Sequence, residues 1–572
     1  MELRRVFLYG ALMAIVFMMW TSWEVDYPSS PKPSAATDNQ QALPGGILGA
    51  EQSNNHFVPT ISQEVAQQSS SASVIPSVSE MIPEQRKITV QTDVLIVTID
   101  TLGGNIIETK LLNYKQNIDD DQNPIVLLNN TSGTRYVAQS GVAAVGQAQP
   151  SEIQFSADKQ NVTLQPSEDK LEVNLVSQDE NGLQVIKTYR FKRDSYLIDL
   201  NYQLKNTAAK EWQGSIYNQL VRVEPPSETS WFHIGSYTGA AISDPENKLY
   251  EKISFSDIAK RNLNRTIKGG WAAMQQHYFI SAWVPNSNQT SRYYSHDNGR
   301  GEYTIGYIGP VLQIPTGQQV EQTSRFYVGP ALPDKLEEIA PGLDLTVDYG
   351  ILWFISIFLF WVMKYIHQVV GNWGWSIVIV TLFIKLAFYH LSAKSYRSMA
   401  NMRRLTPKMQ ALRERYADDK AKLSQATMDL YRKEKVNPLG GCLPILVQIP
   451  VFIALYWVLL ESVDLRHAPF ILWINDLSSP DPYFILPVLM GLTMFVQQKL
   501  NPAPPDPMQA KIMMALPFVF TLLFLTFPAG LVLYWTVNNG LSILQQWYIT
   551  RSVENQSSNN QNNKTIAKAA ND

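Results

Sequence analysis

One ionisable side chain in an apolar segment constrains this chain more than any other feature. Residues 373–389 are almost entirely apolar and long enough to cross a bilayer, yet Lys385 lies among them. An ammonium group at that depth costs about 2.5–3.5 kcal/mol even on lenient insertion scales. The segment therefore predicts a functional polar pocket inside a membrane protein. The alternative is that the long lysine stem carries its charge out to the lipid headgroups.

The rest of the chain divides into two unlike halves. Residues 28–334 have the composition of a soluble protein, whereas residues 350–549 are mostly apolar. The length of 572 residues predicts several domains, and the formal net charge of −3 averages over both halves. Cys442 is the only cysteine, so no internal disulfide can form. An exported soluble half must therefore be stabilised by its own core.

Residues 1–27 are predicted to form a transmembrane anchor. Arg4 and Arg5 precede the apolar run 6–20, and the positive-inside rule holds this end in the cytoplasm. A cleaved signal peptide is the alternative, but no small-x-small cleavage site follows the run. Residues 28–86 are rich in Ser, Gln, Pro and Asn and cannot bury enough apolar surface to fold. We expect a flexible linker there, on the outer side of the membrane.

Residues 87–334 are predicted to form one large antiparallel β-sandwich. Helical periodicity is nearly absent there, and alternating apolar runs are bounded by Asn, Asp, Gly or Lys. His233 and His277 are candidate catalytic residues, but no partner lies at a telling spacing, so half-buried structural histidines are the preferred interpretation. The predicted strands lie at 88–97, 171–176, 183–190, 196–204 and 214–223, with a turn at 102–105.

The region 335–368 is predicted to end in an amphipathic helix over 351–368. By hydropathy this helix is a candidate membrane span. A span here would be followed at once by the span that holds Lys385, which would place the next basic loop on the wrong side of the membrane. We therefore expect the helix to lie in the outer interface, with its tryptophans at headgroup depth.

Five spans are predicted within 369–549, which with the anchor gives six. The first enters from outside, and the loop after it is strongly basic and therefore cytoplasmic. Apolar regions at 443–460 and 484–496 supply the next two spans. The run 512–549 is too long for one span and is broken at 527–530, so it predicts a helical pair that turns on the outer side. Both termini are then cytoplasmic, and 550–572 is a polar cytoplasmic tail.

The loop 391–438 is predicted to be a cytoplasmic helical hairpin. Apolar residues recur at three- and four-residue spacing on both sides of 417–419, where Asp419 is placed as a helix N-cap, and Pro407 is expected to bend the first helix. The basic residues of this loop either reflect the positive-inside rule alone or form a binding surface for acidic or RNA-containing partners such as a ribosome. The basic residues are Arg403, Arg404, Arg413, Arg415, Lys420 and Lys422.

Polar side chains recur on one face of four of the predicted spans. Such stripes either form hydrogen bonds between neighbouring helices or line a cavity that holds water. No carboxylate lies at depth to neutralise Lys385, so a hydrated recess opening toward the cytoplasm is the preferred interpretation. The stripes are Thr381, Lys385, Tyr389 and Ser392; Gln448, Phe452 and Tyr456; Thr493 and Gln497; and Tyr534, Asn538, Ser542 and Gln545.

These residues and the order of the segments resemble the YidC membrane protein insertases in their long Gram-negative form. The resemblance covers nearly the whole chain and is specific because several motifs occur together. It implies a protein of the bacterial inner membrane with a large periplasmic domain, no enzymatic activity and no cofactor. The motifs are NPLGGC at 437–442, QIPVF at 448–452, DPY at 481–483, LPVLMG at 486–491 and FPAGLVLYW at 527–535.

The resemblance also implies roles for individual residues. The family groove carries a positive residue, usually arginine, and the matching position here is Lys385, which keeps the charge but loses the bidentate fork. Thr381 and Trp535 fall where the family contacts an incoming substrate helix, with Phe452 and Gln497 beside them. The predicted groove is lined by Thr381, Lys385, Gln448, Phe452, Gln497, Tyr534, Trp535 and Asn538.

The partners implied by the resemblance are nascent membrane proteins, the Sec translocon and membrane lipids. The ribosome and the signal recognition pathway are candidate partners of the cytoplasmic hairpin, and no specific nucleic-acid sequence is expected. The tail departs from the basic ribosome-binding tail of many members, because only Lys564 and Lys568 are basic within 555–572. The outer domain looks like a sugar-binding supersandwich, from which no sugar activity is carried over.

Two other functions compete with insertion. A small-molecule secondary transporter would also place a charge at depth, but it should show inverted repeats and broken helices in both halves. An anchored periplasmic carbohydrate enzyme would account for the sandwich but not for five further spans. No P-loop, HExxH or GxSxG motif is present. The energy for insertion must then come from hydrophobic burial, helped by the membrane potential on acidic segments.

Overall fold

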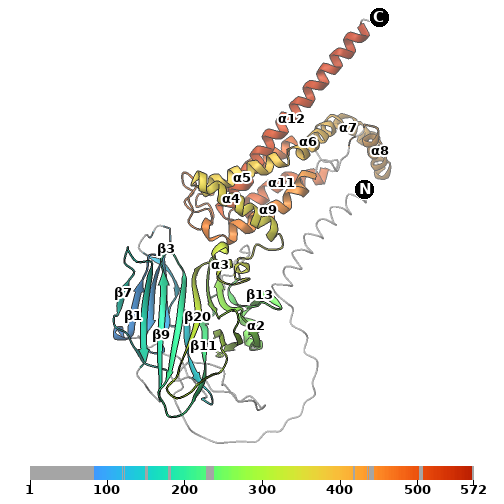
Figure 1. Ribbon diagram of the computed structural model, residues 1–572. Helices are drawn as coiled ribbons and strands as arrows, with labels where there is room; N and C mark the ends of the chain where they lie inside the picture. The colour runs from blue at the N-terminus through green and yellow to red at the C-terminus, as the bar shows by residue number, and fades with distance from the viewer. Residues whose placement is uncertain are drawn as a thin grey trace, which may run out of the picture.

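The computed structural model describes residues 83–118, 120, 123–147, 152–177, 182–226, 237–416, 419–434, 436, 443–501 and 507–569. The predicted anchor 1–27, most of the linker 28–86 and His233 lie outside these residues. Figure 1 shows a β-rich part followed along the chain by a helical part, with the long last helix pointing away from the strands.

The described residues of the β-rich part form twenty strands in two sheets, which confirms the predicted large sandwich. All pairs are antiparallel except β1 with β7. The strands are β1 Lys87–Gln91, β2 Leu95–Asp100, β3 Asn105–Lys115, β4 Pro124–Leu128, β5 Tyr136–Ala144, β6 Phe155–Ser156, β7 Asn161–Thr163, β8 Lys170–Ser177, β9 Leu183–Lys192, β10 Leu197–Asn206, β11 Trp212–Val223, β12 Gly239–Asp244, β13 Lys248–Ile253, β14 Asn264–Lys268, β15 Trp271–Gln276, β16 Phe279–Val284, β17 Thr290–Asp297, β18 Glu302–Ile308, β19 Leu312–Ile314 and β20 Gln319–Pro330.

The two sheets differ in size and share one core. The eleven-stranded sheet runs β14-β17-β18-β11-β5-β3-β2-β1-β7, with β19 beside β11 and β4 beside β3, and the nine-stranded sheet runs β13-β12-β15-β16-β20-β10-β9-β8-β6. Side chains on β8 and β10 alternate between buried and more exposed positions, as expected for strands with one face in a core. Trp271, Trp283 and Phe326 are among the largest fully buried side chains.

The predicted single strand at 88–97 is wrong, because the structure has a tight turn in its middle. Thr92 follows β1 directly, and its hydroxyl accepts hydrogen bonds from the backbone N–H groups of Val94 (3.2 Å) and Leu95 (2.9 Å). A threonine hydroxyl that binds nearby backbone in this way competes with the strand ladder. The chain therefore reverses, and β1 pairs with β2.

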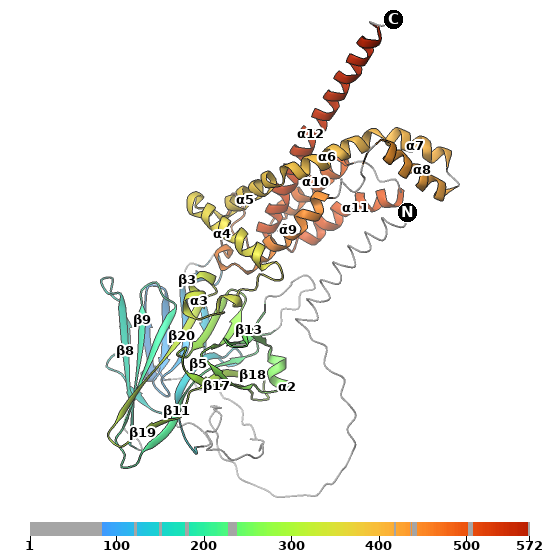
Figure 2. The ribbon, with the colours of Figure 1, turned by 45° about the vertical axis from the view of Figure 1, so that its right-hand side comes forward.

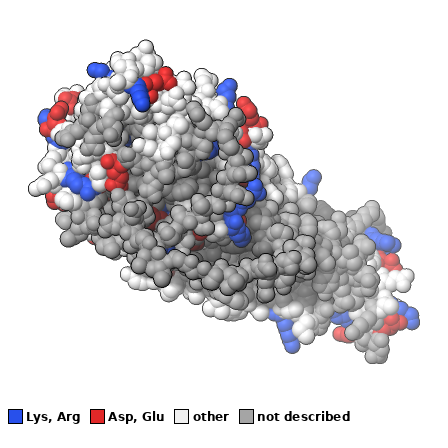
Figure 3. All heavy atoms as spheres, turned by 90° about the horizontal axis from the view of Figure 1, so that it is seen from below, with Lys and Arg blue, Asp and Glu red and all other residues white. Residues whose placement is uncertain are grey.

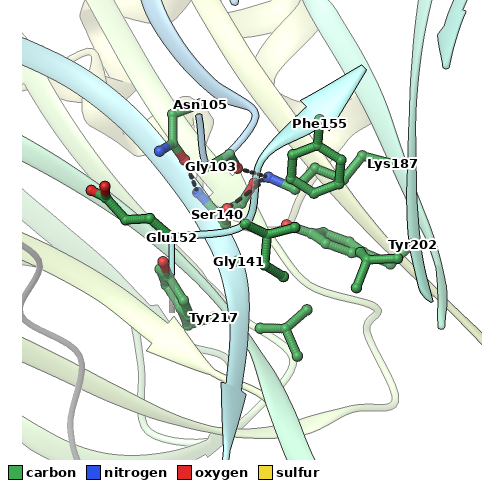
Figure 4. Close-up of a pocket in the computed structure, with 12 residues that line it drawn as sticks. Gly103, Asn105, Ser140, Gly141, Glu152, Phe155, Lys187, Tyr202 and Tyr217 are labelled. Carbon is green, nitrogen blue, oxygen red and sulfur yellow. Dashed lines mark hydrogen bonds between the residues drawn. The ribbon is translucent and has the colours of Figure 1, made fainter. Parts of the chain in front are cut away.

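A buried lysine ties the two sheets together. Lys187 on β9 is fully buried, and its ammonium group donates to the carbonyl oxygens of Gly103 (2.7 Å), Gly104 (3.1 Å) and Ser140 (2.7 Å). Figure 4 shows the contacts with Gly103 and Ser140 in a pocket that Phe155 and Tyr202 also line. Burial lowers the pKa of Lys187 well below its usual value. Because all three N–H groups have acceptors, Lys187 serves as a structural cross-link.

The face of the sandwich that is seen from below carries charges of both signs. Seen from below, positive and negative side chains are interspersed among the coloured residues of this face (Figure 3). Such mixing keeps a surface soluble without creating a field that selects one class of charged partner.

The helical part begins after the last strand. Its elements are α3 Pro333–Ile339, η2 Asp344–Thr346, α4 Trp353–Val370, α5 Trp373–Ala387, α6 Tyr389–Arg404, α7 Thr406–Arg415, α8 Lys420–Lys433, α9 Leu443–Glu461, η4 Val463–Leu465, α10 Ile485–Leu500, α11 Pro507–Phe524 and α12 Ala529–Ala569; α2 Phe255–Lys260 lies within the sandwich. Gly371 ends α4 in the left-handed conformation (φ 71°), and the Asn372 side chain caps α5 by accepting from Trp375 N at 3.0 Å.

The helices differ in length from the predicted spans. Within the described residues, α4 is the one helix that is long and apolar enough to cross a bilayer alone. The pair α5 and α6 passes the same test only as one broken span, because the two helices bend by 68° at Phe388. The apolar helices over Val447–Glu461, Ile485–Leu500 and Ala510–Phe524 are shorter. The break predicted at 527–530 is observed between α11 and α12.

The predicted hairpin 391–438 includes a helix that stays with the helical core. Ala393 and Tyr396 on α6 are buried against Ile549 of α12, so this first segment does not project. The pair α7 and α8 extends beyond it in both views (Figure 2). Asp419 caps α8 as predicted, accepting from Lys422 N at 3.0 Å, and Pro407 lies in the first turn of α7.

The sandwich is attached to one end of the helical part through specific hydrogen bonds. The imidazole Nε2 of His277 lies 2.9 Å from the backbone oxygen of Leu460 at the end of α9. Arg466 donates to the Lys115 carbonyl at the end of β3 (2.8 Å). His277 is thus a half-buried residue of the joint between the two parts.

Candidate functional site

Lys385 lies where α5 packs against α12. Its side chain is buried, with 6% of its surface exposed, and its ammonium donates to the Ser542 hydroxyl at 2.7 Å. Across the described ranges, no carboxylate lies within ion-pair distance of Lys385. A buried cation without a counter-ion is costly in a protein interior. Its retention here is the main physical indication of a site.

The polar stripe predicted around Lys385 is only partly formed. Thr381 is fully buried, but its hydroxyl donates to the Ile377 carbonyl in its own helix (2.6 Å). Ser392 is also buried. Tyr389 is 38% exposed, because the bend at Phe388 rotates α6 away from the face of α5. The predicted stripe assumed one straight helix over 381–392 and therefore did not include that bend.

An aromatic cluster joins α9, α11 and α12. The ring of Phe452 meets the ring of Trp535 edge-on at a centroid distance of 4.6 Å and stacks on Tyr534 at 6.1 Å. Phe524 lies 5.3 Å from the Trp535 ring. The indole Nε1 of Trp535 is buried and makes no hydrogen bond with the described residues. Three of the predicted groove residues are therefore brought together by packing.

The remaining predicted groove residues are less closely tied to Lys385. Gln448, Gln497 and Asn538 are half-buried, and no side-chain hydrogen bond between them and Lys385 is present in the described part of the chain. Asn538 contacts this site through its main chain, because its backbone oxygen accepts a hydrogen bond from the Ser542 hydroxyl at 2.7 Å.

Asn539 and Gln546 also belong to the polar face of α12, although the predicted stripe does not include them. Asn539 donates to the Thr493 hydroxyl of α10 (3.4 Å), and Gln546 donates to the Asn501 side chain (3.1 Å). With Ser542, these residues follow an i, i+3, i+7 spacing, which also defines one helical face. In the sequence, this spacing would have identified Asn539 and Gln546 as members of the polar face.

The basic residues of the predicted hairpin occupy different environments. Arg403, Arg415 and Lys422 are exposed, and Lys422 pairs with Asp419 at 3.2 Å. Arg404 donates to the Val553 carbonyl of α12 at 3.1 Å, which fastens the end of α6 to that helix. Arg413 is half-buried, and the side chain of Lys420 lies outside the described atoms.

Comparison with known proteins covers both parts of the chain. The family profile described as "YidC periplasmic domain" matches residues 87–362, and "60Kd inner membrane protein" matches residues 365–557. The membrane protein insertase YidC of Legionella pneumophila (strain Corby) is 52% identical over 554 residues, which cover 96% of this chain and 97% of that protein. The chain belongs to the YidC family.

A second named insertase and a solved structure are also similar to this YidC-family chain. The membrane protein insertase YidC of Coxiella burnetii (strain RSA 493 / Nine Mile phase I) is 46% identical over 97% of both chains. A crystal structure of an active YidC insertase aligns over 81% of this chain and 92% of that one, with 19% identity and a TM-score of 0.35. The relatives are named for insertion and not for a chemical reaction. The transporter alternative has no support from these comparisons.

Proposed function

We propose that this YidC-family chain moves nascent membrane proteins into the bacterial inner membrane through a hydrated recess that opens toward the cytoplasm. The observation that carries the proposal is the buried ammonium of Lys385, held by a neutral hydroxyl and not by a carboxylate. A cation in that position attracts acidic residues of a client's outer segment. The membrane potential adds about 2.3 kcal/mol per charge per 100 mV on such segments.

The recess acts by lowering the cost of partitioning. Polar backbone that enters hydrocarbon loses its hydrogen bonds to water, at several kcal/mol per unsatisfied group. Water and the polar side chains of α5, α10 and α12 replace those bonds while the client's polar segment passes. The apolar segment moves into lipid beside the aromatic cluster around Trp535. No covalent step is required.

Six spans are proposed for the membrane part: the anchor 1–27 and five within 369–549. Helix α4 is proposed to lie in the outer interface, although its length and composition suit a span. Its exposed face carries Trp353, Phe354 and Trp361, exposed by 57–64%. Its other face is fastened to α9 by the Ser356 hydroxyl, which donates to the Ala454 carbonyl at 3.0 Å. Aromatic residues of this kind prefer the membrane–water interface.

The topology is tested by labelling single cysteines from either side of intact inner membrane. In a Cys442→Ser background, Ala417→Cys should react only from the cytoplasm and Ser478→Cys only from the outside, because the basic loop stays inside. Equal reaction of both with an impermeant reagent added from one side would refute the six-span arrangement.

The partners proposed for this chain follow from the hairpin and the membrane part. The exposed Arg403 and Arg415 give α6 and α7 a basic surface suited to a ribosome or the signal recognition pathway. The Sec translocon is the proposed partner within the membrane. The weakly basic tail is not proposed as a ribosome-binding segment.

Insertion itself is tested by depleting the chain from cells and measuring which membrane proteins fail to insert. We expect membrane proteins with acidic outer segments to accumulate uninserted, and a plasmid copy of the chain to restore them. An unchanged set of inserted proteins, with uptake of a small solute lost instead, would favour the transporter.

A further inference from the structure

Lys385 has one hydrogen-bond partner among the described residues, the Ser542 hydroxyl of α12. The partner is itself fixed: the Ser542 hydroxyl donates its proton to the Asn538 carbonyl at 2.7 Å, so its oxygen lone pairs remain to accept. Ser542 is 2% exposed and therefore shielded from competing water. A hydroxyl oriented in this way accepts from an ammonium group in one defined position.

A lysine needs such a partner more than an arginine does. The guanidinium group is planar and presents its donors in a rigid fork, whereas the ammonium sits on a flexible four-carbon stem. An ammonium group has three N–H donors, and Ser542 takes one. The other two have no protein acceptor in the part of the chain that the structure describes. They are the donors that a client carboxylate would meet.

We infer that Ser542 is the positioning residue of the site: it holds the Lys385 ammonium with two N–H groups open to client carboxylates and so sets the preference for acidic clients. This inference rests on the proposed role of Lys385. Ser542 acts through Lys385 and not by touching the client. Its removal should therefore affect only clients whose insertion uses that charge.

The test compares two clients that differ only in whether their outer segment carries Asp or Asn, inserted by the full-length chain in cells depleted of the native copy. Ser542→Ala should lower insertion of the acidic client about fivefold, a part of what losing a hydrogen bond to a charged group costs, and leave the neutral client unchanged. Ser542→Thr keeps the hydroxyl and should restore the acidic client. Lys385→Ala/Ser542→Ala should be no worse than Lys385→Ala alone.

The matched control is Ser376→Ala on α5. Ser376 is fully buried, and its hydroxyl donates to the Asn372 carbonyl at 3.0 Å, which is the same local bond without contact with Lys385. It should leave both clients unchanged. An equal loss of both clients in Ser542→Ala at matched protein level, or no loss of either, would overturn the positioning role. Full insertion of the acidic client by Lys385→Ala would refute the proposed function of Lys385 itself.

Discussion

Lys385→Glu is expected to lower the insertion of clients with acidic outer segments about a thousandfold. The substitution sets a carboxylate where the client's own carboxylates must pass. Two like charges about 4 Å apart repel by about 4 kcal/mol at the effective dielectric constant of partly buried sites, and salt screens them less there than in bulk water. The measurement is protease protection of a pulse-labelled client in cells depleted of the native copy.

The companion variants separate charge from packing. Lys385→Arg should retain insertion because sign and position are kept, and Lys385→Ala should fall between arginine and glutamate. Clients without outer charges should change least in every variant. If the lysine only carries its charge to the headgroups, alanine should be neutral or mildly stabilising for all clients. Equal insertion of acidic and uncharged clients by the glutamate variant, at matched expression, would remove Lys385 from the mechanism.

Lys187→Ala is expected to destabilise the β-sandwich by about 4 kcal/mol. The substitution leaves the carbonyl oxygens of Gly103 and Ser140 without the ammonium that binds them and opens a cavity between the sheets. Unsatisfied buried acceptors cost about 1–3 kcal/mol each, so the loss of two acceptor contacts accounts for about this value. Denaturant unfolding of the purified chain, followed by near-ultraviolet circular dichroism, gives the change in the free energy of unfolding.

Two comparisons make the Lys187 result specific. Lys192→Ala on the same strand removes an exposed lysine paired with Asp199 at 2.9 Å and should cost less than about 0.5 kcal/mol. The lowered pKa of Lys187 means that the unfolded chain binds more protons up to about pH 10.4. The stability of the native chain should therefore rise with pH between the lowered pKa of Lys187 and about pH 10.4, and the alanine variant should lack this rise. Equal unfolding midpoints for both alanine variants would show that Lys187 is not a cross-link.

Much of the secondary structure follows from local patterns. The strands β8 to β11 lie where alternating apolar residues predicted them, and Asp419 caps α8 as its position before a helical stripe indicated. The break between α11 and α12 falls at the predicted Pro-Ala-Gly step. These features depend on residues close together in the chain, and the sequence expresses them directly.

Other features depend on competition between local patterns and long-range packing. Residues 88–97 alternate as one strand would, yet the Thr92 hydroxyl and the pairing of β1 with β2 favour a turn. The stripe from Thr381 to Ser392 has helical spacing throughout, yet α6 is turned by 68° from α5 and buries Tyr396 against α12. The periodicity of a sequence predicts which face of a strand or helix is buried. It does not predict whether a turn or a bend interrupts that element.

The sequence by itself determined the two-part architecture, the charged position in an apolar helix and the family, because composition, hydropathy and contiguous motifs are properties of neighbouring residues. Only the tertiary structure decided which groups meet. Ser542 lies 157 positions after Lys385 and is its hydrogen-bond partner because α5 and α12 pack together. Lys187 looks like an ordinary strand lysine until the sandwich closes over it. Such pairings arise from burial, which no local pattern encodes.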